Sequence, residues 1–186
     1  MLTGRDGKKL LNLARNSASS YLANKNFKIE GAVEKEYSAK QGVFVTLTIE
    51  GELRGCIGYP EPILPLAEAV ASAARAAAFE DPRFPSVNAT ELEKIRFEVS
   101  VLTVPEEIIY KDAKELPKKI EIGKDGLIIR KSFNSGLLLP QVATEYNWSP
   151  EEFLDNLCMK AGLSPAAWKK GGISLWKFSA QIFTED

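Results

Sequence analysis

The chain has 186 residues, with 24 lysines and arginines against 25 aspartates and glutamates and no histidine. This length suits a single domain over residues 1–186, or two compact subdomains that share one core. The balanced charge gives no global positive field, which disfavours nucleic-acid binding, and the lack of histidine excludes Ser-His-Asp triads, Cys-His dyads and histidine metal sites.

The N-terminal region carries no sign of a membrane segment or a signal peptide. Charged residues between positions 5 and 9 interrupt its apolar residues, and a spanning helix or a signal sequence would need a longer apolar run. The two cysteines, Cys56 and Cys158, lie far apart without metal-ligand spacing, as is usual for reduced intracellular thiols. We therefore expect a cytoplasmic protein that holds no metal and no cofactor.

The first half of the chain predicts a helix, a hairpin and a second helix. Apolar residues recur near helical spacing over 6–24, which indicates an amphipathic helix. Residues 43–49 are rich in β-branched side chains and predict a strand, and a short glycine-containing link predicts a hairpin that returns over 53–59. An alanine-rich helix is expected over 65–79, because proline is tolerated in a first helical turn.

Three polar residues of the second expected helix share one line along its surface. Glu68, Ser72 and Arg75 are spaced by four and by three residues, so their side chains lie on the same side of the helix. This line is either the solvated face of the helix or the wall of a cleft beside the hairpin.

The middle of the chain predicts irregular structure and short strands. Residues 81–85 contain two prolines, which favour a turn. Residues 95–104 alternate and predict a strand that Pro105 ends, and residues 120–122 and 127–130 predict two short strands on either side of a turn.

The last third of the chain has clear helix signals. Ser149, Pro150 and Glu152 are typical of a helix start with a capping box, and Gly162 is placed to end that helix. A shorter helix is expected up to Trp168, and alternating residues over 176–182 predict a final strand. Short links and the irregular order of elements favour an α+β fold with a mostly antiparallel sheet and packed helices.

Cys56 lies between two glycines in the segment Leu53–Gly58. Glycines let another group approach the backbone closely, so Gly55 and Gly58 indicate a site that is lined by main chain. Three roles for Cys56 stay open: a packed core residue, a nucleophile or redox-active thiol whose pKa Arg54 lowers, and an incidental residue of a binding pocket. On an extended strand, Arg54 and Cys56 point to the same face.

Three arginines and a glutamine are candidate ligand contacts. Arg54, Arg75 and Arg83 would suit a carboxylate or phosphate ligand if they converge, because a guanidinium group binds such groups with two hydrogen bonds. Asp81 is expected to pair with Arg83 or to stabilise the turn. Gln141 follows four apolar residues, so its amide should find a hydrogen-bond partner or face a cleft.

Several separate segments, in the right order, resemble the AMMECR domain family. They are LRGCIG at 53–58 followed by Tyr59-Pro60, DPRFP at 81–85, EVSVL at 98–102 and GLLLPQVA at 136–143, continuing to Trp148. The resemblance spans nearly the whole chain. It implies one AMMECR-like α+β domain with a larger and a smaller subdomain, and a groove between them beside the cysteine-containing hexapeptide.

The resemblance also implies partner proteins. In many microbial genomes, similar domains are fused to or encoded with Memo-like proteins, which are related to non-haem dioxygenases, and with radical SAM proteins. We predict that the groove around residues 53–58 binds a small anionic or peptide ligand. We expect no membrane among the partners. The expected ligand contacts are Gly55, Ile57, Gly58, Arg75, Arg83 and Gln141. The alternative is an enzyme or enzyme component in which Cys56 and Arg54 are the catalytic residues.

Overall fold

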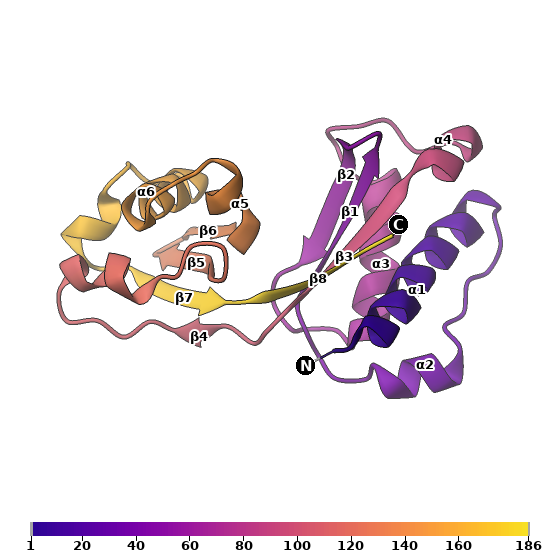
Figure 1. The fold of residues 1–186 in the computed structure, drawn as a ribbon, viewed down its shortest axis with the longest axis horizontal. Coiled ribbons are helices and arrows are strands. Elements are labelled where there is room, and N and C mark those ends of the chain that lie inside the picture. Colours follow the sequence, from indigo (N-terminus) through magenta and orange to yellow (C-terminus); the bar gives the residue numbers. More distant parts are fainter. Residues whose placement is uncertain (1, 186) are drawn as a thin grey trace. The chain divides into compact units, whose positions relative to one another are not determined.

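The computed structural model describes residues 2–185 and contains two compact units. The first unit runs to Leu102 and resumes at Gln181, and the second unit comprises Thr103–Ala180. Each unit has a four-stranded sheet and its own cluster of buried hydrophobic side chains (Figure 1). The strands pair antiparallel and helices pack on the sheets, so the predicted α+β fold with a larger and a smaller part is confirmed.

The sheet of the first unit has the strand order β2-β1-β3-β8. Its strands are β1 (Val43–Ile49), β2 (Glu52–Tyr59), β3 (Arg96–Leu102) and β8 (Ala180–Thr184). The predicted hairpin is confirmed, and its two turn residues, Glu50 and Gly51, have φ angles of 52° and 87°. Positive φ at both positions is typical of a type I′ turn, whose twist matches that of the paired strands. β2 is an edge strand of this sheet.

Two helices cover one face of the first sheet. They are α1 (Gly4–Leu22) and α3 (Leu66–Phe79), which pack against each other and against the strands. The covered face is apolar, with Val43, Val45 and Leu47 fully buried. Because side chains alternate along a strand, Thr46 and its partner Cys56 point to the other face, where both are half-buried.

The structure contains two short helices in the first unit that the sequence interpretation missed. They are α2 (Gly31–Glu36) and α4 (Ala89–Lys94). The start of α4 does have a sequence signal, because Asn88 and Glu91 form a capping box. Each helix has only six residues, which is too few to show the repeating apolar spacing of an amphipathic helix, so this pattern could not identify them.

The second unit has the strand order β4-β7-β5-β6. Its strands are β4 (Glu106–Glu107), β5 (Gly126–Lys131), β6 (Asn134–Leu138) and β7 (Ser174–Phe178), and its helices are α5 (Pro140–Glu145), α6 (Pro150–Lys160) and the 3-10 helices Ala113–Lys119 and Ala167–Lys170. The helix start at Ser149 is confirmed, with a capping box to Glu152. Cys158 is fully buried in the core of this unit, as its place in the apolar stripe predicts.

Two strand predictions are wrong. Residues 120–122 form no strand, because the Glu121 N–H donates to the Asp125 carboxylate at 2.9 Å and the chain turns there. The expected strand over 176–182 is divided at Ser179, because β7 belongs to the second sheet and β8 to the first. The Thr103 N–H donates to the Ser179 carbonyl, and the Ser179 N–H donates to the Thr103 hydroxyl oxygen, where the chain first enters the second unit.

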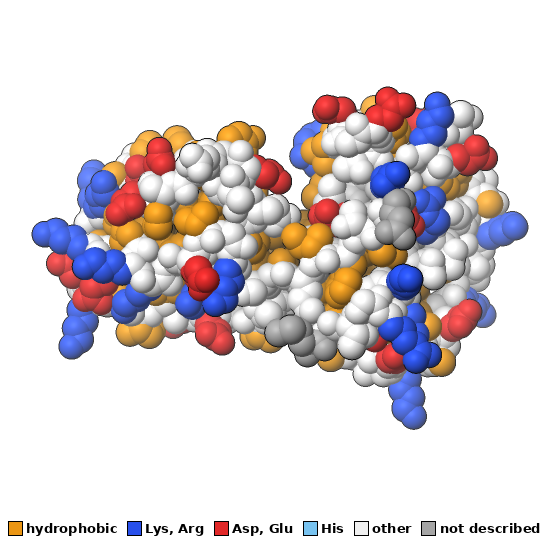
Figure 2. Space-filling model, in the orientation of Figure 1, with side chains coloured by type: hydrophobic (Ala, Val, Ile, Leu, Met, Phe, Trp, Pro, Cys, Tyr) orange, Lys and Arg blue, Asp and Glu red, His pale blue; other side chains and the backbone are white. Residues whose placement is uncertain are grey.

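Two further observations concern residues 2–185. No helix in this range is both long and apolar enough to cross a membrane, and no group of three carboxylate or thiol side chains in it is arranged to hold a metal ion. On the face shown in Figure 2, lysine and arginine side chains are interspersed with aspartates and glutamates.

Candidate functional site

Cys56 lies on the edge strand β2, and two side chains bind its main chain. The Cys56 N–H donates to Asp81 Oδ2 at 2.9 Å, and Arg83 Nη2 donates to the Cys56 carbonyl at 3.2 Å. Both side chains come from the irregular segment after α3. An uncovered edge strand offers these backbone groups to other chains, so Asp81 and Arg83 close the edge at Cys56 and fix its position.

Asp81 is the centre of this arrangement. Its side chain is only 2% exposed. Its Oδ1 accepts from the Arg83 N–H at 3.1 Å and from Arg83 Nε at 3.0 Å, and its Oδ2 accepts from Arg83 Nη2 at 2.7 Å. The hydrogen bonds from Arg83 hold the pKa of Asp81 well below its usual range. The predicted pairing of Asp81 with Arg83 is confirmed, and the two charges cancel.

Arg54 is also paired with a carboxylate, and it is 9% exposed. Its Nε donates to Glu91 Oε1 at 2.9 Å, and its Nη2 donates to the Pro85 carbonyl at 2.9 Å and to Glu91 Oε2 at 3.2 Å. Its Nη1 is buried and has no hydrogen-bond partner among residues 2–185. The Phe84 ring contacts two cations, with its centroid 5.8 Å from Arg54 Cζ and 5.5 Å from Arg83 Cζ.

The Cys56 thiol contacts a hydroxyl group of the neighbouring strand. Its Sγ lies 3.3 Å from Thr46 Oγ1, directly across the pairing of β1 with β2. Burial raises the pKa of Cys56, and the smaller opposing effects come from Thr46 and Arg83. The sequence predicts that Arg54 lowers this pKa, but the structure pairs Arg54 with Glu91 instead. Burial therefore favours the neutral thiol over the thiolate.

The residues next to Cys56 pack inside the first unit. A Cβ atom at Gly55 would lie 2.2 Å from the Ala77 carbonyl of α3, and one at Gly58 would lie 2.5 Å from the Phe44 ring. Ile57 is partly buried against the hydrophobic core of the unit. The glycines thus allow close approach of protein groups, at the positions where the sequence suggested approach of a ligand.

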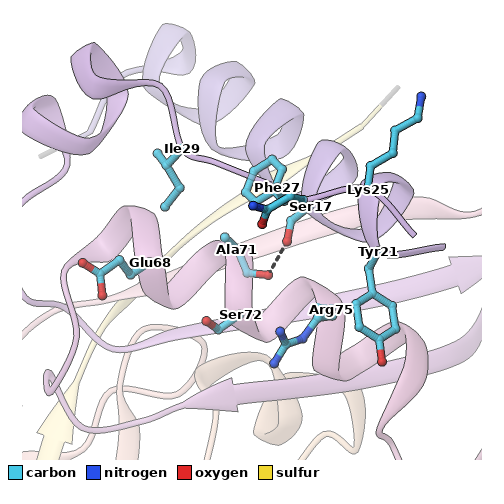
Figure 3. A pocket seen from close by; sticks show the side chains of 10 residues that line it. Ser17, Tyr21, Lys25, Phe27, Ile29, Glu68, Ala71, Ser72 and Arg75 are labelled. Atoms are coloured by element: carbon cyan, nitrogen blue, oxygen red, sulfur yellow. Dashed lines mark hydrogen bonds between the residues drawn. The ribbon is translucent and has the colours of Figure 1, made fainter. Parts of the chain in front are cut away.

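Arg75 lies in a different environment. It lines a pocket of about 370 Å³ together with Tyr21, Glu68 and Ser72 (Figure 3). Its Nε is 3.5 Å from Glu80 Oε1, and its Cζ is 5.5 Å from the centroid of the Tyr21 ring. The polar line along α3 therefore borders a cleft, but not the cleft beside the hairpin that the sequence suggested. The wall opposite α3 is α1 and the segment after it, and the lining residues include none from the β1–β2 hairpin.

Gln141 belongs to the second unit, in the first turn of α5. Its Oε1 is buried and has no hydrogen-bond partner in the described part of the chain. A buried amide oxygen without a partner costs free energy, and no group in residues 2–185 compensates for this one.

Sequence reasoning missed two residues of the site, Thr46 and Glu91. The two-residue turn alone would place Thr46 opposite Gly55, and a register shift between Leu47 and Thr48 places it opposite Cys56 instead, so the turn does not fix this pairing. The partnership of Arg54 with Glu91 joins residues 37 positions apart. The capping box of α4 signals a role for Glu91 at the helix start, but no local pattern links it to Arg54.

The chain is similar to known proteins over nearly its full length. A family model described as AMMECR1 matches residues 11–183. A protein of Thermofilum pendens is 50% identical over 196 residues, which cover 99% of this chain and 92% of that protein. Protein MJ0810 of Methanocaldococcus jannaschii is 49% identical, with 100% of this chain and 92% of that protein covered. The crystal structure of protein PH0010 from Pyrococcus horikoshii matches with a TM-score of 0.93 at 44% identity, covering 100% of this chain and 94% of that one.

Proposed function

The chain belongs to the AMMECR1 family, and from this premise we propose that it is a ligand-binding protein whose binding site is the surface around Cys56. We define this Cys56 surface by Thr46, Cys56, Arg83 and Phe84, all at least partly exposed. The observation that carries the proposal is the fixed main chain of Cys56, which Asp81 and Arg83 hold while the thiol stays half-buried. A surface that is held in place before binding loses less conformational entropy when a ligand arrives.

The charges near Cys56 favour a peptide over a small anion as the ligand. Asp81 neutralises Arg83 and Glu91 neutralises Arg54, so little positive charge remains to attract an anion. The Cys56 surface offers a hydroxyl group, a thiol, the edge of a guanidinium group and an aromatic ring. These groups suit the amides and apolar side chains of a peptide.

The alternative function, an enzyme with Cys56 as its nucleophile, has less support. A nucleophilic cysteine needs either a base within hydrogen-bond reach or a lowered pKa. Among residues 2–185 the hydrogen-bond partner of the thiol is Thr46, whose hydroxyl accepts no proton at neutral pH, and burial raises the pKa of Cys56. We therefore assign Cys56 to ligand contact.

The family resemblance supports a further part of this proposal, the identity of the partner proteins. Similar domains are fused to or encoded with Memo-like and radical SAM proteins, so a peptide segment of such a partner is the ligand that we propose. Isothermal titration of this protein with the Memo-like protein from the same genome tests this step. We expect a saturable heat of binding that a competing mixture of tetrapeptides reduces. If no heat of binding is measured at high micromolar concentrations of both proteins, the proposed partner is wrong.

The first experiment measures the protonation of the thiol. We would follow the rate of Cys56 alkylation against pH in the folded protein, and use the Cys56→Ser variant to subtract any signal from Cys158. We expect an apparent pKa above the free value of about 8.5, because burial disfavours the thiolate. An apparent pKa below about 7 would mean an activated thiol and would favour the enzyme function instead.

The second experiment tests binding directly. Amide resonances of Thr46, Cys56 and Phe84 would be followed by NMR during titration with a mixture of tetrapeptides, and separately with inorganic phosphate at equal ionic strength. We expect saturable shifts with the peptides and none with phosphate. Shifts with phosphate alone would identify an anion site, and no shifts with either probe would refute ligand binding at the Cys56 surface.

A further inference from the structure

A pocket lies on the side of the first unit where α1 and α3 meet. This α1–α3 pocket has a volume of about 370 Å³ and is lined by Ser17 and Tyr21 of α1, by residues of the segment 25–29 and by Glu68, Ala71, Ser72 and Arg75 of α3 (Figure 3). Its volume falls within the usual range for sites that bind small molecules. None of the residues that define the Cys56 surface lines it.

The lining of the α1–α3 pocket combines polar and apolar side chains, and its floor is held in place. The Ser17 hydroxyl donates to the Ala71 carbonyl at 2.7 Å and ties the two helices together. The small side chain of Ala71 leaves space above the floor. Phe27 and Ile29 form the facing wall and are packed against the core of the unit. Ala71, Phe27 and Ile29 therefore offer a ligand apolar contacts without rearranging the fold.

The α3 side of the pocket carries opposite charges at its two ends, and Lys25 is a third charged residue of the lining. Glu68 and Arg75 are seven positions apart on α3, about 10 Å along the helix axis, and Ser72 lies between them (Figure 3). Within residues 2–185, no hydrogen bond or ion pair engages the carboxylate of Glu68 or the hydroxyl of Ser72. Arg75 has a 3.5 Å contact with Glu80 and lies over the Tyr21 ring, which orients its guanidinium group without burying it.

We propose that the α1–α3 pocket binds a zwitterionic peptide of two or three residues. Its amino group pairs with Glu68, its carboxylate with Arg75, and its side chains lie on Ala71 and Ile29. An extended peptide spans about 3.5 Å per residue, so two or three residues bridge the two charged ends and a single amino acid reaches only one of them. The opposite charges select a molecule with two free termini, and the apolar contacts at Ala71 and Ile29 select small apolar side chains.

The test uses trialanine and two blocked forms of it, N-acetyl-trialanine and trialanine amide. Each would be titrated at constant ionic strength into the complete protein, with the amide resonances of Tyr21, Ala71 and Ser72 followed by NMR. We expect saturable shifts with trialanine, and an affinity at least about tenfold weaker for each blocked form, because each one leaves a charged side chain unpaired. Equal affinities for all three peptides, or shifts that do not saturate, would overturn the proposal.

Two variants assign the ends of the peptide. Glu68→Gln should weaken trialanine about tenfold and leave N-acetyl-trialanine unchanged, and Arg75→Gln should weaken trialanine and leave trialanine amide unchanged. The matched controls are Glu93→Gln and Arg5→Gln, which alter exposed residues outside the pocket and should change none of the affinities. If Glu68→Gln and Arg75→Gln bind trialanine as the wild type does, the assigned contacts are wrong.

Discussion

Two polar regions of the first unit use the same residue types in opposite ways. Around Cys56, Arg54 and Asp81 are 9% and 4% exposed, and each is bound to an oppositely charged side chain. Along α3, the Arg75 side chain is 47% exposed and its contact with Glu80 is long, at 3.5 Å. The first region holds its charges inside hydrogen-bonded pairs, and the second leaves them at the surface.

This difference teaches what each arginine can do. A buried charge must be paired, because desolvation is costly, and removing its partner destabilises the fold. The pairs around Cys56 therefore position the main chain, and little of their charge is left for a ligand. An exposed arginine contributes little to stability, so the charge of Arg75 is available for binding. Arg54 and Arg83, from the segments LRGCIG and DPRFP, are thus the arginines that bind a neighbouring carboxylate with short hydrogen bonds.

The largest expected effect is the loss of Asp81. Asp81→Ala removes the acceptor of the Cys56 N–H and the partner of Arg83, and we expect the free energy of unfolding to fall by about 2–4 kcal/mol. Urea denaturation at pH 7 measures it, with the exposed Glu93→Ala as a control that should stay within about 0.5 kcal/mol. A loss below about 1 kcal/mol would mean that the buried pairs are no more structural than the exposed charges.

The same residue predicts a dependence on pH. Folding lowers the pKa of Asp81, so its carboxylate stabilises the fold at pH values above the unfolded pKa of about 3.9. That stabilisation is lost as the pH falls below this value towards the folded pKa. The free energy of unfolding of Asp81→Ala should therefore fall less than that of the wild type between pH 5 and pH 3, values that bracket the unfolded pKa of about 3.9. Urea denaturation at each pH measures both proteins. If the two free energies fall in parallel, Asp81 is not the group that stabilises the fold in this range.

The second expected effect comes from Gly55, which lets α3 approach β2. A Cβ atom there would lie 2.2 Å from the backbone carbonyl of Ala77, so Gly55→Ala must displace the helix or the strand. We expect a loss of about 2–3 kcal/mol in urea denaturation. Gly4→Ala is the matched control, because no atom lies within 4 Å of the added Cβ and alanine suits a helix. Similar losses in both variants would show that the close approach is unimportant.

The fold could be predicted from the sequence where the signals are local. The hairpin over β1 and β2 and the start of α6 depend on turn and capping residues that are neighbours in the chain. The division of the last strand at Ser179 has another origin. The residues on both sides of Ser179 alternate well enough for one strand, and the change from one sheet to another depends on pairing with distant strands.

In the site, too, contacts between residues close in the sequence could be predicted, and contacts between distant residues could not. Asp81 and Arg83 are two positions apart, so their pairing could be read from the turn. Glu91 is 37 positions from Arg54, and the sequence left Arg54 free to act on Cys56. The sequence also suggested that three arginines converge, but the structure places Arg75 with Tyr21 and Glu80. Such partnerships depend on how α3 and the following segment pack.

Substituting Arg54 and Arg75 by alanine gives the most direct comparison of the two regions, and the effect of Arg75→Ala is the smallest that we expect. Arg54→Ala removes charged hydrogen bonds to Glu91 and Pro85 and should cost about 2 kcal/mol, whereas Arg75→Ala should stay within about 0.5 kcal/mol. Both are measured by urea denaturation at low and at high salt. Salt should reduce only the effect of Arg75→Ala, because it screens exposed charges more than buried pairs.

Arg54→Lys makes this comparison sharper. Lysine keeps the charge but lacks the planar fork that binds Glu91 through two nitrogens, so Arg54→Lys should recover less than half of the stability that Arg54→Ala loses. At position 75 the lysine variant should equal the wild type, because the 3.5 Å contact with Glu80 needs only a charge. If lysine restores full stability at position 54, charge alone holds that region together, and the two regions differ in burial but not in the geometry of their hydrogen bonds.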